Sequence, residues 1–159
     1  MPFMNSAFHR FFRLSSLERG MFVRGVLLLP IAACALRFVR MKTVMSWMEV
    51  HAGGVGLQFE RDQDAIRRLS QTAQKMLEAA SRYGVARGNC LSRSMVLCHL
   101  LRRNGLPATL RVGGRKEGSQ FAAHAWVELD GLVIDSSEGL HKDFVPFDRT
   151  KSGAWSSEQ

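Results

Sequence analysis

The chain has only three cysteines among its 159 residues, far fewer than a disulfide framework requires. They are Cys34, Cys90 and Cys98. Because Cys90 and Cys98 lie eight positions apart in one predicted helix, about 12 Å would separate them, too far for a disulfide bond. We therefore expect reduced thiols and a cytoplasmic protein.

Long apolar runs are also missing. The most apolar stretch, residues 25–36, has about twelve residues, whereas a transmembrane helix needs roughly 20. Pro30 interrupts it, and we expect the helix that begins at a capping box of Ser15 and Glu18 to kink or break there. The run predicts a buried helix or one that contacts a membrane. A lipoprotein cleavage site before Cys34 is a weaker alternative, because the preceding region is long and contains Glu18.

No run of five or more basic residues occurs, although the net charge is +8. The charge favours an acidic partner, such as an acidic peptide or an anionic membrane surface. Dispersed basic residues without a recognisable motif do not indicate nucleic acid binding. The sequence also lacks a GxxxxGK[ST] phosphate loop and metal-ligand spacing, so we expect no cofactor and no metal.

Apolar residues at helical spacing predict two further helices. One extends from about Asp64 to Tyr83. The other begins near Cys90 with Asn89 as its N-cap, and Asn104-Gly105 ends it.

Strands follow the helices. The candidates are residues 108–112, 121–129 and 132–135. Residues 113–120 are predicted to be a polar loop, and Asp130-Gly131 predicts a two-residue hairpin turn. Helices followed by an antiparallel sheet predict an α+β fold. We expect a helical extension over residues 1–60, a domain over 61–150 and a flexible tail over 151–159.

Cys90 is the first candidate for chemistry, because it lies at a predicted helix N-terminus after Gly88 and Asn89. The positive end of the helix dipole favours a thiolate, which is the nucleophilic form of cysteine. Backbone N–H groups at the same end are placed to stabilise an oxyanion. An isolated cysteine is more often a small buried side chain, which is our interpretation of Cys34 and Cys98.

The predicted hairpin brings His124 and Asp135 together. With Asp130-Gly131 as the turn, Asp135 faces Trp126, which shares a side of the sheet with His124. A carboxylate at this diagonal position can orient an imidazole. Glu128 shares that side but is four residues from His124, so it is the second choice. A cysteine at a helix start, a histidine on a strand and an aspartate on the paired strand follow papain-like logic.

Four segments carry a resemblance to a known family: residues 90–94 (CLSRS), 101–105 (LRRNG), 121–128 (FAAHAWVE) and 133–135 (VID). They resemble the transglutaminase-like proteins of lasso-peptide biosynthesis, which cut the precursor peptide before ring closure. The His-Ala-Trp part is shared across the wider transglutaminase-like group, whereas the Cys-Leu-x-Arg-Ser start is more particular.

The resemblance implies a papain/transglutaminase-like core, with a catalytic helix packed on a small antiparallel sheet. It implies Cys90 as nucleophile, His124 as general base and Asp135 as orienting acid. The substrate would be a ribosomally made precursor peptide, and an asparagine-synthetase-like cyclase would close its macrolactam ring. Because the first 60 residues look helical, we expect a separate small leader-recognition protein to present the precursor.

Two other functions fit the same residues. A transglutaminase-like acyl transferase would use an amine in place of water, and a non-catalytic peptide-binding subunit would have no reactive thiol. Arg93, one turn after Cys90, is expected to hold a structural carboxylate or, as the second choice, an acidic substrate.

Overall fold

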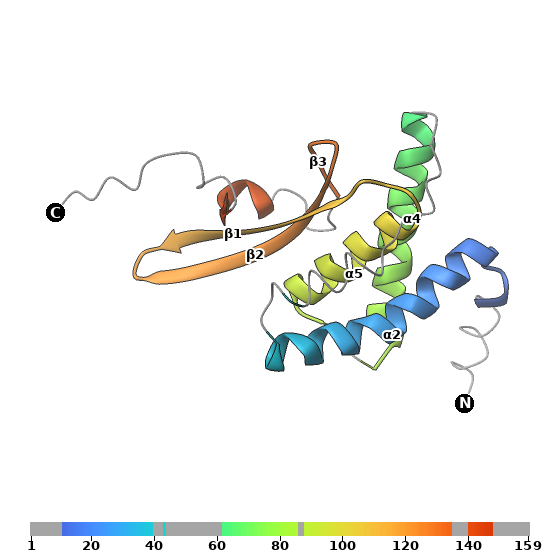
Figure 1. The fold of residues 1–159 in the computed structure, drawn as a ribbon, viewed down its shortest axis with the longest axis horizontal. Helices are drawn as coiled ribbons and strands as arrows, with labels where there is room; N and C mark the ends of the chain where they lie inside the picture. The colour runs from blue at the N-terminus through green and yellow to red at the C-terminus, as the bar shows by residue number, and fades with distance from the viewer. Residues whose placement is uncertain (1–10, 40–42, 44–61, 86–87, 135–139, 148–159) are drawn as a thin grey trace.

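The fold places helices before a sheet in the chain (Figure 1). The computed structural model describes residues 11–39, 43, 62–85, 88–134 and 140–147. The helices are α2 (Ser16–Phe38), α4 (Gln63–Tyr83) and α5 (Cys90–Arg103), and a short 3-10 helix is η1 (Leu140–Asp143). The strands are β1 (Thr109–Glu117), β2 (Gln120–Leu129), β3 (Leu132–Val133) and β4 (Val145–Pro146). They form an antiparallel sheet of order β3-β2-β1-β4, which confirms the predicted α+β fold.

Helix α2 begins at the predicted capping box and continues through Pro30. The Glu18 N–H donates to Ser15 Oγ at 3.2 Å, and the Ser15 N–H donates to Glu18 Oε2 at 2.7 Å. Sequence analysis predicted a kink or a break at Pro30, and the break is wrong because α2 continues to Phe38. Leu29 and Ala32, on either side of Pro30, are buried in the core, and this packing outweighs the hydrogen bond that proline removes.

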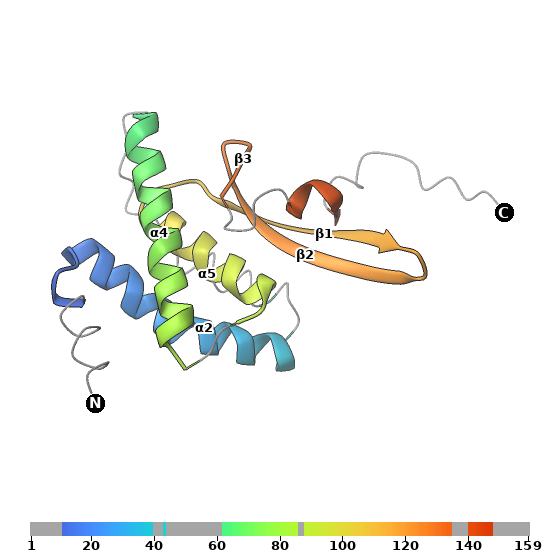
Figure 2. The same cartoon turned by 180° about the vertical axis from the view of Figure 1, so that it is seen from behind.

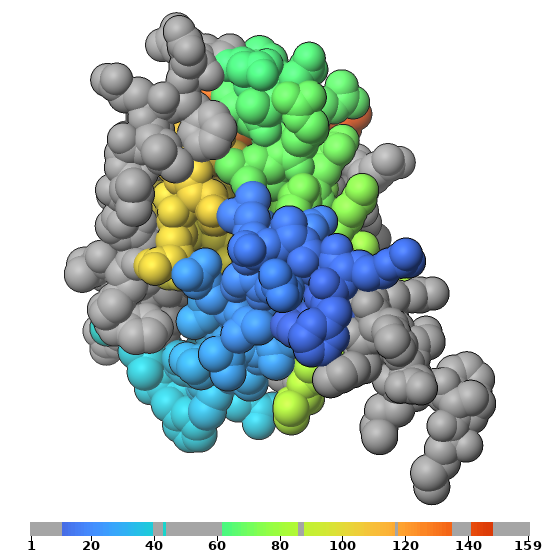
Figure 3. Space-filling view, turned by 90° about the vertical axis from the view of Figure 1, so that its right-hand side faces the viewer, coloured from blue at the N-terminus to red at the C-terminus, as the bar shows by residue number. Residues whose placement is uncertain are grey.

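The outer face of α2 is apolar, and Figure 3 shows α2 spread over one side of the molecule. The exposed side chains Val23, Leu27 and Ile31 recur every four residues and form one stripe. By length and composition α2 could cross a membrane, with a mean hydropathy of 1.8, so the prediction from residues 25–36 underestimated this helix. Its opposite face packs on α4 and α5.

Helix α5 lies at the centre of the fold, in contact with α2, α4 and β2 (Figures 1 and 2). Every residue from Ser94 to Leu101 is buried, as expected for a helix covered on all sides. The core combines side chains from the helices and β2, including Met21, Leu29, Leu77, Val96, Leu100 and Val127. The predicted 1–60 extension therefore contributes α2 to the same core as α4 and α5. The predicted tail, 151–159, lies outside the described residues.

The first strand is longer than predicted. Strand β1 continues through residues 113–117 and pairs with β2 as far as Gln120, so the loop predicted over 113–120 is only the turn at residues 118–119. The glycines there reflect close packing, because a Cβ at Gly113 would lie 2.7 Å from the Val145 carbonyl oxygen on β4. Phe144, next to β4, is buried.

The β2–β3 hairpin has the predicted turn. Asp130 and Gly131 have φ angles of 50° and 80°, as a type I′ turn requires. The register is the predicted one, with the pairs Glu128–Val133 and Leu129–Leu132. Ile134 continues it, since its N–H donates to the Val127 carbonyl oxygen at 2.7 Å. The next residue, Asp135, lies outside the described residues.

Candidate active site

Cys90 is the first residue of α5, and its side chain is exposed. Asn89 is the predicted N-cap, because its Oδ1 accepts the Ser92 N–H at 2.9 Å. Gly88 has a φ of 65°, which favours glycine, and a Cβ there would lie 2.7 Å from Ser92 Oγ. The segment Gly-Asn-Cys thus starts the helix abruptly. It leaves the thiol beside the N–H groups of the first turn, where negative charge is favoured.

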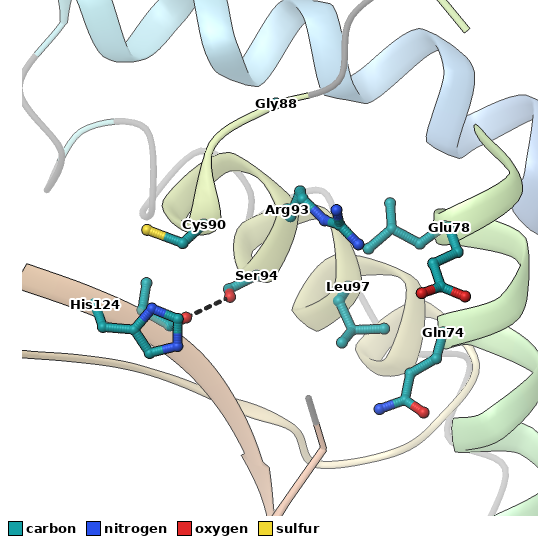
Figure 4. A pocket seen from close by; sticks show the side chains of 10 residues that line it. Gln74, Glu78, Gly88, Cys90, Arg93, Ser94, Leu97 and His124 are labelled. Atoms are coloured by element: carbon teal, nitrogen blue, oxygen red, sulfur yellow. Dashed lines mark hydrogen bonds between the residues drawn. The ribbon is translucent and has the colours of Figure 1, made fainter. Parts of the chain in front are cut away.

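His124 and Cys90 line the same hollow, which has a volume of about 260 Å³ (Figure 4). Cys90 comes from the start of α5 and His124 from the middle of β2. Side chains from α4 form the opposite wall. The structure therefore brings two of the three predicted catalytic residues to one site.

A buried hydrogen bond joins the elements that carry these two residues. Ser94, one turn after Cys90, donates from its Oγ to the Ala125 carbonyl oxygen at 2.9 Å (Figure 4). Ala125 is adjacent to His124 in β2. Strand β1 pairs with one edge of β2. Along the opposite edge, and among the described residues, β3 pairs only with the final two residues of β2, so the Ala125 carbonyl on that edge is accessible to α5. The open edge of β2 thus positions His124 next to the helix that begins with Cys90.

Aromatic rings hold the His124 imidazole. Its centroid lies 6.2 Å from the Trp126 ring, with an interplanar angle of 18°, and 5.3 Å from the Phe144 ring. The Arg115 guanidinium lies 5.0 Å from the centroid of Phe144. These contacts restrict the rotation of the imidazole on the side away from α5.

The orienting carboxylate has two candidates. Asp135 lies outside the described residues, so its role remains a prediction. Both oxygens of Glu128 already accept hydrogen bonds: Oε1 from Trp126 Nε1 at 3.0 Å, and Oε2 from Arg111 Nε at 2.9 Å. Glu128 therefore supports the tryptophan that stacks on His124, and its role as the second-choice orienting acid stays a prediction.

Arg93 lines the hollow together with Gln74 and Glu78. Figure 4 shows the Arg93 side chain extending from α5 towards Glu78 on α4. Within the described residues no ion pair of Arg93 is found, so the expected structural carboxylate is not observed there. Sequence analysis missed Gln74 and Glu78. Their spacing of four residues placed them on one face of α4, but nothing in the sequence showed which element that face meets.

The other cysteines differ in environment. Cys98 is buried as expected, and its Sγ lies 3.4 Å from the Ala108 carbonyl oxygen. Cys34 is exposed on α2, so the prediction that it is buried is wrong. Cys34 lies near the C-terminal end of α2, after the last of the buried residues of this helix, which are Met21, Gly25, Leu29 and Ala32. In the described parts of the chain, no group of three His, Cys, Asp or Glu residues could hold a metal ion.

Comparison with known proteins gave one match. A family model described as the transglutaminase-like superfamily matches residues 32–148, which include α4, α5 and the whole sheet. No curated protein and no solved structure matched. The chain belongs to the transglutaminase-like superfamily, which includes cysteine peptidases and acyl transferases and commonly uses cysteine-type catalysis.

Proposed function

We propose that this transglutaminase-like protein is a cysteine peptidase that removes the leader from a ribosomally made lasso-peptide precursor before macrolactam ring closure. The observation that carries the proposal is the shared hollow of Cys90 and His124 at the N-terminus of α5. The resemblance of the CLSRS and FAAHAWVE segments to the lasso-peptide enzymes supports the choice of substrate.

In the proposed reaction, His124 takes the thiol proton and the Cys90 sulfur attacks the carbonyl carbon at the leader–core junction. The N–H groups at the start of α5 stabilise the oxyanion. The C–N bond then breaks, and His124 returns the proton to the amine, which leaves as the free N-terminus of the core. Water loses a proton to His124 and attacks the thioester carbonyl carbon. The C–S bond then breaks, His124 returns the proton to the Cys90 sulfur, and the leader leaves as a carboxylic acid that ionises to a carboxylate. Asp135 keeps the imidazole oriented throughout.

The proposed partners come from the resemblance to the lasso-peptide enzymes. A small leader-recognition protein presents the precursor in trans, and an asparagine-synthetase-like cyclase then uses the released amine and its own ATP. The described residues before α5 are helical, unlike a strand-rich recognition module, which supports recognition by a separate protein. Ribosomal precursors and ATP are both available in the cytoplasm, which is the proposed location.

Helix α2 is the proposed membrane contact. Its exposed apolar stripe is flanked on both sides by arginines, at positions 19, 24 and 37. Arginines at the borders of an apolar stripe suit an anionic surface, with the helix lying in its plane. Leu27→Glu is expected to abolish co-sedimentation with phosphatidylglycerol vesicles. Val85→Glu, at an exposed position outside α2, is the control, and equal binding by both variants would reject the contact.

The peptidase is tested by mass spectrometry of a precursor peptide encoded beside the gene, incubated with the protein and its small partner. Wild type is expected to release a leader fragment and a core with a free amine. Cys90→Ala is expected to release neither, whereas Cys34→Ala, which alters another exposed cysteine, should cleave normally. Leader release by Cys90→Ala would refute the proposal.

An acyl transferase is the second candidate, since the superfamily includes such enzymes. The same Cys90 thioester would then be attacked by an amine, and the leader would carry an amide in place of a carboxylate. The mass of the released leader separates these outcomes. A peptide-binding subunit without activity would show neither product.

A further inference from the structure

A second hollow continues from the candidate active site along α4. It has a volume of about 540 Å³ and lies between α4 and the end of the β2–β3 hairpin. Gln74 lines both hollows, so they meet at this side chain. The volume falls in the range of ligand-binding pockets, roughly 300–1,000 Å³.

The lining of the second hollow suits a peptide. Ser70, Gln71 and Gln74 provide hydroxyl and amide groups, and Ile66 and Ile134 provide apolar surface. The charged side chains in the lining are two acids and one base, so no strong charge selects a phosphate or a nucleic acid.

Ser70 points to a missing hydrogen-bond partner. The residue is only 3% exposed, and its Oγ has no hydrogen-bond partner in the structure. A buried hydroxyl without a partner is unfavourable. A peptide N–H or carbonyl group in the hollow would satisfy it.

Strand β3 presents a second set of peptide-binding groups at the same wall. It is an edge strand, and Leu132 and Val133 line the hollow. Backbone groups alternate in direction along an antiparallel strand, and the Ile134 N–H points to β2. The N–H and carbonyl of Val133 therefore point away from β2, as the edge strand of a peptide-binding sheet does.

We propose that the second hollow binds the leader as an extended strand, on its N-terminal side of the cleaved bond. This inference rests on the peptidase activity proposed above. Leu77 lies in the first hollow, and Ser70 and Gln63 lie 7 and 14 residues before it, or about 10 and 21 Å along the helix. An extended peptide advances by about 3.3 Å per residue, so the second hollow binds leader residues about three to six positions before the cleaved bond.

The chemistry explains why the leader, and not the core, occupies this hollow. After the C–N bond breaks, the leader stays attached to Cys90 as a thioester while the core leaves. Contacts to the leader therefore keep the thioester in place for the attack by water. Contacts to the core would delay its release to the next enzyme.

The test uses the full chain and acetyl-polyalanine chloromethyl ketones of one to seven residues. The Cys90 thiolate displaces chloride from these reagents, which occupy only the N-terminal side of the bond. We expect kinact/KI for Cys90 to rise about tenfold between the two-residue and the five-residue reagents. Peptide mapping assigns the labelled cysteine, and the exposed Cys34 is the internal reference.

Variants on α4 locate the effect. Ser70→Ala combined with Gln71→Ala should lose the gain with length but keep the rate of the one-residue reagent. Lys75→Ala, at an exposed position that lines neither hollow, should keep the gain. A wild-type rate independent of length, or a gain that survives in the folded double variant, would overturn the inference. If Cys90 reacts no faster than Cys34 with every reagent, the peptidase proposal itself fails, and the inference with it.

Discussion

Replacing Ser94 by alanine tests whether one hydrogen bond holds the two halves of the candidate active site together. Ser94 and its acceptor residue Ala125 are 6% and 1% exposed. The alanine variant leaves a buried carbonyl without its donor, so we expect the free energy of unfolding to fall by about 1–3 kcal/mol. Ser70→Ala is the matched control, because it removes a buried hydroxyl that has no partner and should leave stability unchanged or slightly higher.

The same substitution should also affect catalysis. Without the bond, α5 can shift relative to β2, and small displacements of reacting groups lower kcat by up to about 100-fold. We expect Ser94→Ala to lower kcat for leader release by at least about tenfold, whereas Lys75→Ala, at an exposed position that lines neither hollow, keeps kcat. Urea unfolding followed by circular dichroism and steady-state cleavage measure the two effects. Stability equal to that of Ser70→Ala, together with kcat equal to that of Lys75→Ala, would refute the reasoning.

Three further predictions concern the sheet and α2. Glu128→Gln should lower the free energy of unfolding by about 1–2 kcal/mol but keep the cleavage rate within about threefold. Asp135→Asn should lower kcat by about 10³-fold or more. The reverse kinetic result would make Glu128 the orienting acid. Gly25→Ala should lower the free energy of unfolding by about 1–3 kcal/mol, because its Cβ would lie 2.8 Å from an alanine Cβ on α4. Gly20→Ala should raise the free energy of unfolding by about 0.5–1 kcal/mol. Melting temperatures that shift in the same direction in both variants would contradict this packing. The backbone hydrogen bond at the N-cap lowers the pKa of Glu18. The stabilisation by Glu18 is therefore full above the ordinary value of 4.5 and is lost as pH falls through the lowered pKa, so the stability difference from Glu18→Gln should shrink as pH falls below 4.5 in urea unfolding.

The elements that were predicted correctly are those with a local cause. The Ser15–Glu18 capping box, the Asn89 N-cap and the Asp130-Gly131 turn each depend on contacts within a few residues. The hairpin register follows from the turn, because a two-residue turn sets which residues face each other. Local chemistry therefore predicted where α5 begins and which side of β2 His124 occupies.

The errors have a common physical cause in contacts between distant segments. Residues 113–117 looked like a loop because of their glycines, but the approach of β4 to Gly113 requires a residue without a side chain. The environment of Pro30 likewise depends on α4 and α5, which no local pattern of α2 reveals. The same limit applies to the site. Gln74 and Glu78 enter it only through the rotation of α4 relative to α5, which packing decides.

The contacts of Leu29 connect the N-terminal helix to the chemistry. Leu29 is fully buried in the core that α2 shares with α4 and α5, although it precedes the first residue matched by the family model. A Cβ at Gly88 would lie 3.2 Å from Leu29 Cδ2, so α2 packs against the residue two positions before Cys90. Leu29 therefore packs on the glycine that precedes the Asn89 cap of α5. Helix α2 is therefore part of what positions Cys90, and its exposed outer face is the proposed membrane contact.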